Sequence, residues 1–150
     1  MNKEELMIGD WVTGKKWREK PFQVTRINDG GNFVFGITGD FTVGPVFFDE
    51  LEPIPLTPEI LERNGFNKVT QQGCSNPHYW MMEKYEEESE GLLYRIKAFK
   101  TTFRGMYVHI SNYVDCEPIK FSKQTEHFHE LQNALRLCGL SDIANDFKTE

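Results

Sequence analysis

The segment TEHFHELQNALRLCGL, residues 125–140, holds the densest set of side chains that could do chemistry. His127 and His129 lie two residues apart, and Cys138 follows. Histidines at this spacing on a helix cannot share a metal ion as an i, i+4 pair does, and the segment has no CxxC or HExxH pattern. On a helix, one stripe is apolar and comprises Phe128, Leu131, Ala134, Leu135 and Cys138. The segment is therefore predicted to be an amphipathic helix that covers a sheet, and its histidines are assigned to architecture.

The opposite face of this helix is rich in hydrogen-bonding groups and has no ladder of Glu–Lys pairs. It carries His129, Gln132, Asn133 and Arg136. One interpretation is a docking face for a partner. The other is a face that packs against the N-terminal part of the chain and satisfies loop backbone groups there. The second is preferred, because buried backbone in a small irregular sheet needs such partners.

Other residues of catalytic type lack a specific arrangement. Cys74 lies in a loop close to His78, while Cys138 lies on the apolar stripe, where a thiol is an ordinary core residue. The carboxylates at 86–90 are interpreted as a solvated turn, and DGGNFVFG is a hairpin rather than a phosphate loop. We therefore expect a non-enzymatic protein without a metal or cofactor. A small thiol enzyme or hydrolase is kept as an alternative.

Two stretches combine cations with aromatic rings, which is how single-stranded nucleic acids are held. The net charge is −6, from 17 Lys and Arg against 23 Asp and Glu, and a nucleic-acid binder usually has a basic domain. We therefore expect a protein partner first and a nucleic acid as the alternative. The residues concerned are Lys15, Lys16, Trp17 and Arg18 in the first stretch, and Arg95, Lys97, Phe99, Lys100 and Arg104 in the second.

Turn residues and hydrophobic periodicity predict the elements that must position these groups. Short strands separated by Gly- and Asp-rich turns over residues 1–54 indicate a small bent sheet or barrel. Thr57, Pro58 and Gly65 mark a short helix. Residues 67–120 alternate with a period of two, which predicts an antiparallel meander of at least three strands.

The fold class is therefore predicted to be α+β, in two parts. Residues 1–54 form a small barrel-like subdomain, and residues 55–150 form an antiparallel sheet with a short helix and the C-terminal amphipathic helix. The two parts are expected to fold as one unit. The chain has three cysteines, no CxxC pair, no signal sequence and no apolar run long enough for a membrane span, which predicts a cytoplasmic protein with reduced thiols.

Three segments, LMIGDWV, PIPLTPEILERNGF and HELQNALRLCGL, together resemble a family of short uncharacterised proteins from Bacteroidetes genomes, their phages and their integrated elements. The sequence departs from the family at EHFHE, where relatives tend to have Tyr-Val before the residue matching His129. The family has no assigned activity, so the resemblance implies a biological setting, a phage or mobile element, and no mechanism. Together with the lack of site chemistry, this setting predicts a non-enzymatic accessory or interaction protein. The opening strands are also similar to small Src-homology-type or Tudor-like barrels, which have no single function.

Overall fold

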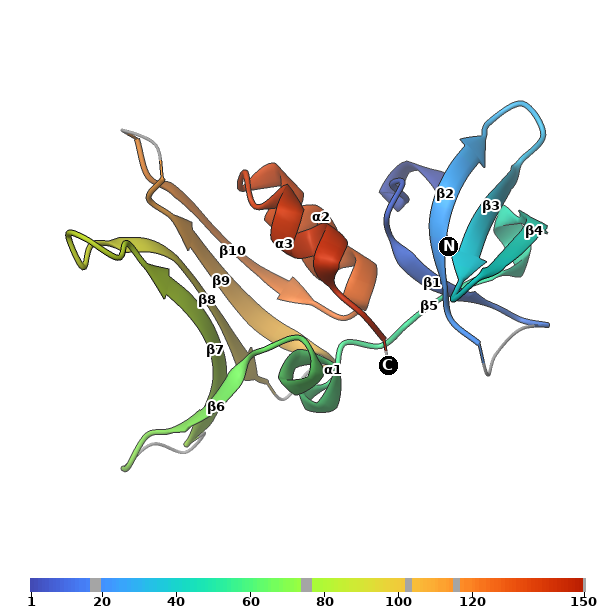
Figure 1. Cartoon of the computed structure of the whole chain (residues 1–150). Coiled ribbons are helices and arrows are strands. Elements are labelled where there is room, and N and C mark those ends of the chain that lie inside the picture. The colour runs from blue at the N-terminus through green and yellow to red at the C-terminus, as the bar shows by residue number, and fades with distance from the viewer. Residues whose placement is uncertain (17–19, 74–76, 102–103, 115–116, 150) are drawn as a thin grey trace.

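The computed structural model describes residues 1–16, 20–73, 77–101, 104–114 and 117–149. These residues form two five-stranded antiparallel sheets, three α-helices and two short 3-10 helices. Figure 1 shows the two sheets at opposite sides of the molecule, with α2 and α3 between them. The predicted α+β class is thereby confirmed.

The first sheet has the strand order β4-β3-β2-β1-β5, so the last strand returns to pair with the first. Register shifts in the β2–β3 and β3–β4 pairs bend it, as β-bulges do. It encloses its own small core, which includes Val12, Phe22 and Val34. Its elements are η1 (Lys3–Glu5), β1 (Trp11–Gly14), β2 (Phe22–Asn28), β3 (Phe33–Thr38), β4 (Phe41–Phe47), η2 (Phe48–Glu50) and β5 (Leu51–Pro53).

The second sheet is a continuous meander with the order β10-β9-β8-β7-β6. Its three central strands are the predicted ones. The two edge strands were not delimited from the sequence, because NKVT and IKFSKQT are largely polar and show little hydrophobic alternation. The strands are β6 (Asn67–Thr70), β7 (His78–Tyr85), β8 (Leu92–Lys100), β9 (Met106–Asn112) and β10 (Ile119–Thr125).

The helices are α1 (Pro58–Arg63), α2 (Phe128–Leu137) and α3 (Ser141–Asp146). The start of α1 is the predicted one, because Thr57 accepts a hydrogen bond from the Ile60 N–H at 3.4 Å. Helix α2 starts later than expected, since β10 continues to Thr125. Its first turn is capped by the Glu130 carboxylate, which accepts from the Glu126 and His127 N–H groups at 2.8 Å each. Among the described residues, none of the helices has the length and apolar character needed to cross a bilayer.

The main core lies between α2 and the second sheet. Phe128, Leu131 and Leu135 are each 0% exposed and pack with Ile96 and Val108 of the sheet. Complete burial of three large side chains makes this contact a major source of stability, at roughly 1.5–3 kcal/mol per side chain. The predicted apolar stripe is therefore confirmed as the face that covers the sheet.

We expect Leu135→Ala to lower the free energy of unfolding by about 3 kcal/mol, because the truncation leaves a cavity in a fully packed core. Urea denaturation followed by circular dichroism measures the change. Leu137→Ala on the same helix is the matched control: that side chain is 69% exposed, so its effect should stay within about 0.5 kcal/mol. Equal losses for the two variants would contradict the assigned face.

Candidate binding surface

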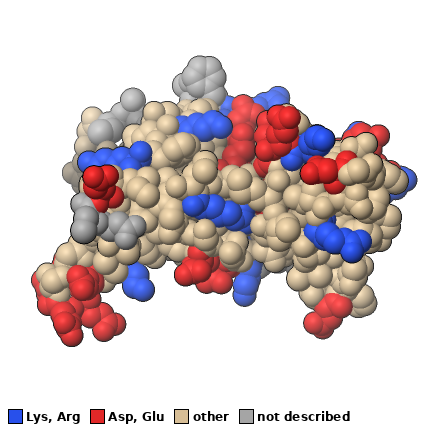
Figure 2. Space-filling model, turned by 90° about the horizontal axis from the view of Figure 1, so that it is seen from above, with Lys and Arg blue, Asp and Glu red and all other residues tan. Residues whose placement is uncertain are grey.

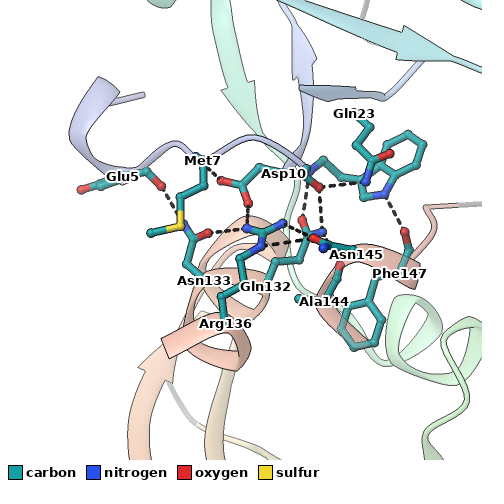
Figure 3. A network of polar contacts seen from close by, with 12 residues as sticks. Glu5, Met7, Asp10, Gln23, Gln132, Asn133, Arg136, Ala144, Asn145 and Phe147 are labelled. Atoms are coloured by element: carbon teal, nitrogen blue, oxygen red, sulfur yellow. Dashed lines mark hydrogen bonds and ion pairs between the residues drawn. The ribbon is translucent and has the colours of Figure 1, made fainter. Parts of the chain in front are cut away.

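The polar face of α2 is used inside the molecule. Gln132 is 0% exposed, and its amide satisfies three backbone groups from two segments, the N-terminal stretch and α3 (Figure 3). Its Oε1 accepts from the Trp11 N–H at 2.9 Å, and its Nε2 donates to Gly9 O at 3.1 Å and Ala144 O at 2.9 Å. Gln132 is therefore unavailable to an external partner, and the packing interpretation is confirmed for it.

Arg136 continues this contact as an ion pair with Asp10, whose side chain is 0% exposed. The Asp10 carboxylate also accepts from the Met7 N–H at 2.8 Å. Burial raises the pKa of Asp10, while the Arg136 guanidinium and the Met7 N–H favour its charged form. Asn133 accepts from Arg136 at 2.7 Å and donates to Glu5 O at 2.7 Å. Asn133 and Arg136, which were also candidates for a docking face, therefore hold the N-terminal segment against α2.

Two neighbours of Asp10 complete the joint between the sheets. Gly9 has φ +94°, and a Cβ there would lie 2.8 Å from the Arg136 guanidinium, so only glycine fits both the backbone conformation and the space. Trp11 donates from its indole N–H to Phe147 O at 2.6 Å. The residues Gly9, Asp10 and Trp11 therefore connect β1 to both α2 and the C-terminal segment.

We expect Arg136→Met to lower the free energy of unfolding by about 3 kcal/mol, because it leaves the Asp10 carboxylate buried without its partner. Asp10→Asn combined with Arg136→Met should cost clearly less than the sum of the two single changes, since neither buried charge then remains. Urea denaturation of the four proteins measures the coupling. Simple additivity would show that the pair is not an energetic unit.

His129, the remaining residue of the predicted polar face, is also buried and therefore does not present a docking surface. The residue is 1% exposed, and neither ring nitrogen has a hydrogen-bond partner among the residues that the structure describes. Its ring stacks against that of His127 with centroids 5.8 Å apart. Burial lowers the pKa of His129 to about 4, because desolvation disfavours the imidazolium ion. The imidazole is therefore neutral at physiological pH.

The lowered pKa makes stability depend on pH in a defined window. The unfolded chain binds a proton at His129 below its ordinary pKa of 6.5, whereas the folded protein does so only near 4. Stability is therefore retained above pH 6.5 and is lost as the pH falls toward 4, by on the order of 3 kcal/mol. We expect His129→Leu to remove this contribution. Urea midpoints of the two proteins should diverge as the pH falls, and a constant difference would contradict the assignment.

The first basic-aromatic stretch lies in the first sheet, at the end of β1. Lys15 donates to Asp49 O at 2.8 Å, and Lys16 forms an ion pair with Glu50 at 2.9 Å. Both contacts place carboxyl-bearing residues beside the lysines and reduce the local positive potential. The stretch is well separated from β8 in Figure 1, so the two basic stretches do not form one surface. Two of its predicted residues, Trp17 and Arg18, lie outside the described residues.

The second stretch lies on an open sheet face, which we call the outer face. Because side chains alternate along a strand, the residues between the core-facing positions point away from α2. Figure 1 shows helices on only one side of this sheet. Strand register aligns the outer-face residues in three rows: Val69, Tyr79, Phe99, Tyr107 and Gln124; Asn67, Met81, Lys97, His109 and Ser122; and Glu83, Arg95, Ser111 and Lys120.

Aromatic rings meet at the centre of the outer face. Phe99 stacks on Tyr79 with centroids 5.2 Å apart, and its edge contacts His109 at 5.6 Å. Tyr107 is 38% exposed and lies 4.9 Å from His109, centroid to centroid. The Lys97 ammonium lies 5.4 Å from the centre of the Tyr79 ring. The structure therefore joins predicted Lys97 and Phe99 to three rings from neighbouring strands.

The remaining residues of the second stretch lie differently. Arg95 is on the outer face but is paired with Glu83 at 2.8 Å. Lys100 pairs with Met106 in the ladder and shares the helix-covered side. Hydrogen bonds at the start of α1 lower the pKa of Glu59, and the charge of Lys100 adds a smaller effect. The assignment of Lys100 to the same surface as Lys97 is therefore wrong, because residues of opposite parity face opposite sides of a sheet. Arg104 is exposed in the β8–β9 connection.

Sequence reasoning missed Tyr79, Tyr107 and His109 as members of this surface. The alternation in β9 contains the signal for Tyr107 and His109, since each of these residues stands between two core-facing residues. In β7 the signal is weak, because Tyr79 and Trp80 are both buried. Which residues lie side by side depends on the register between strands, and that is set by packing across the whole sheet.

The thiol hypothesis gains no support from the residue that can be placed. Cys138 is 1% exposed, and burial raises the pKa of its thiol, which opposes formation of the nucleophilic thiolate. Cys74 lies outside the described residues. Within the described ranges, no group of three or more His, Cys, Asp or Glu side chains is placed to hold a metal ion.

Comparisons of the chain with protein-family models, with curated proteins and with solved structures find no match. The outer face of the second sheet is therefore the basis for assigning a function.

Proposed function

We propose that the protein is a non-catalytic binding protein whose outer sheet face holds a single-stranded nucleic acid. The observation that carries the proposal is the set of three accessible rings, Phe99, Tyr107 and His109, beside Lys97 on a face that no helix of the described residues covers. Tyr79, which is buried at 8% exposure, stacks on Phe99 and contacts Lys97. Rings on an open surface stack with bases of any sequence, and nearby cations attract the phosphates.

The local charge of the outer face supports a polyanionic ligand, although the whole chain is acidic. The charged residues in the three aligned rows are Arg95, Lys97 and Lys120 against Glu83 alone. Part of the excess negative charge lies elsewhere, in the exposed glutamates of the β7–β8 turn. In the view from above, cations and carboxylates are interspersed, and carboxylates gather at one end of the molecule (Figure 2). Net charge is therefore a poor guide to this one face.

A protein partner is the second candidate, and a different observation favours it. Tyr113, Val114 and Ile119 are 37%, 59% and 39% exposed beside the β9–β10 connection. Apolar side chains grouped in this way are suited to a protein contact. The resemblance to phage and mobile-element proteins fits either ligand, and under both proposals the protein acts as a cytoplasmic accessory factor.

Fluorescence anisotropy with a labelled oligothymidylate tests the first proposal. We expect Tyr107→Ala to weaken binding about tenfold, because it removes one stacking ring. Lys97→Gln should weaken binding and reduce the salt dependence of the binding constant by one phosphate contact, about 0.7 in the log–log slope. Lys148→Gln, an exposed lysine outside the second sheet, is the matched control and should leave binding unchanged.

Two results would overturn the assignment. Absence of binding at low salt would exclude a nucleic-acid ligand for this face. Binding that is lost in Lys15→Gln/Lys16→Gln but retained in Tyr107→Ala would move the interface to the first sheet. Capture of a nuclease-insensitive protein partner that requires Tyr113 and Val114 would support the second candidate instead.

A further inference from the structure

Three polar residues of the outer face lie side by side on neighbouring strands: Lys97 on β8, His109 on β9 and Ser122 on β10. Lys97 pairs with His109 in one ladder, and His109 pairs with Ser122 in the next. Side chains directly opposite one another on antiparallel strands have Cβ atoms about 4.5–5.5 Å apart. His109 and Ser122 are both exposed. The ends of the three side chains can therefore contact one small ligand.

A short hydrogen bond links two of these residues, because Ser122 Oγ lies 2.6 Å from His109 Nδ1. When the hydroxyl donates to Nδ1, the neutral imidazole carries its proton on Nε2, where it is available to a ligand. When Nδ1 donates instead, the hydroxyl proton of Ser122 is available. The pair therefore keeps a donor in either arrangement, which suits a ligand group that only accepts, such as a phosphate oxygen.

The charges around the pair favour an anion. Lys97 forms no ion pair with a carboxylate among the described residues. Lys120 adds a second cation on the next row of the outer face. Glu83, the carboxylate of the aligned rows, is already engaged by Arg95 at 2.8 Å. A phosphate on this polar row is therefore attracted without displacing an ion pair.

The neighbouring row supplies aromatic rings at a suitable distance. Phe99 and Tyr107 stand two residues from Lys97 and His109 along their strands, which is about 7 Å. The Phe99 and Tyr107 rings lie 5.6 Å and 4.9 Å from the His109 ring, centroid to centroid. The base and the phosphate of a nucleotide are separated by one sugar. The two rows therefore match the two parts of a single nucleotide.

We propose that Lys97, His109 and Ser122 form a phosphate subsite, and that one nucleotide of a single strand binds with its phosphate there and its base on Phe99 or Tyr107. This inference rests on the proposed function and refines it, because it sets the path of the ligand. The sugar–phosphate backbone crosses β10, β9 and β8 along the polar row. Contacts to phosphate carry no sequence information, so the subsite recognises nucleotides as a class.

The test uses the full chain and NMR of the tyrosine and histidine ring carbons, with thymidine monophosphate and thymidine as probes. We expect saturable shifts of the Tyr107 signals, with thymidine binding at least about fivefold more weakly because it lacks the charge-assisted hydrogen bonds. Ser122→Ala and His109→Phe, which keeps a ring, should each weaken monophosphate binding about fivefold without weakening that of thymidine. Ser111→Ala on the next row is the matched control and should change neither.

Equal binding of thymidine and its monophosphate would overturn the subsite, as would monophosphate binding that is unaffected by Ser122→Ala and His109→Phe. Tighter binding of N-acetyl-phosphotyrosine amide would assign the two rows to a phosphopeptide and would also overturn it. If oligothymidylate binding depends on Tyr107 but not on Ser122 or His109, the subsite fails and the proposed function stands. If the monophosphate binds as expected and oligothymidylate does not bind, the subsite stands and the proposed function fails.

Discussion

The buried ion pair between Asp10 and Arg136 is the contact on which the arrangement of the two sheets depends. A buried charge is stable only when it has an oppositely charged partner and further hydrogen bonds. Asp10 therefore requires both the guanidinium of α2 and the backbone of its own segment. Gln132 adds bonds to the backbone on either side, at Gly9 and Trp11. The two hydrophobic cores are thereby fixed relative to each other, because the polar face of α2 contacts the first sheet while its apolar face covers the second.

This joint gives a structural role to two of the segments that the sequence analysis singled out. GDW near the start and LQNALR near the end contact each other, although more than 120 residues separate them. Each residue type has a reason there: glycine for the close approach of Arg136, aspartate for its charge, and glutamine for its paired donor and acceptor. These motifs therefore explain how the protein is built, and the search for its function moves to other surfaces.

Those surfaces lie where the joint leaves the second sheet uncovered. Because α2 covers one side of the second sheet, the strand residues that alternate with the core-facing ones lie together on the outer face. These residues are aromatic and basic, so the local charge of the face is positive although the whole chain is acidic. The same helix also buries the neutral imidazole of His129, whose ring nitrogens have no hydrogen-bond partner among the described residues. The packing of α2 on one side of the second sheet thus accounts both for the uncovered outer face and for the buried imidazole.

The sequence alone determined the α+β class, the amphipathic stripe of α2, the cap of α1 and the central strands, because these follow from hydrophobic periodicity and turn chemistry over a few neighbouring residues. It also indicated that the polar face of α2 would satisfy backbone groups. Only the tertiary structure decided which backbone those groups meet, that His129 is buried, and that Lys97 and Phe99 lie beside Tyr79 and Tyr107 of the neighbouring strands. These outcomes depend on strand register and on contacts between distant segments, which local patterns do not encode.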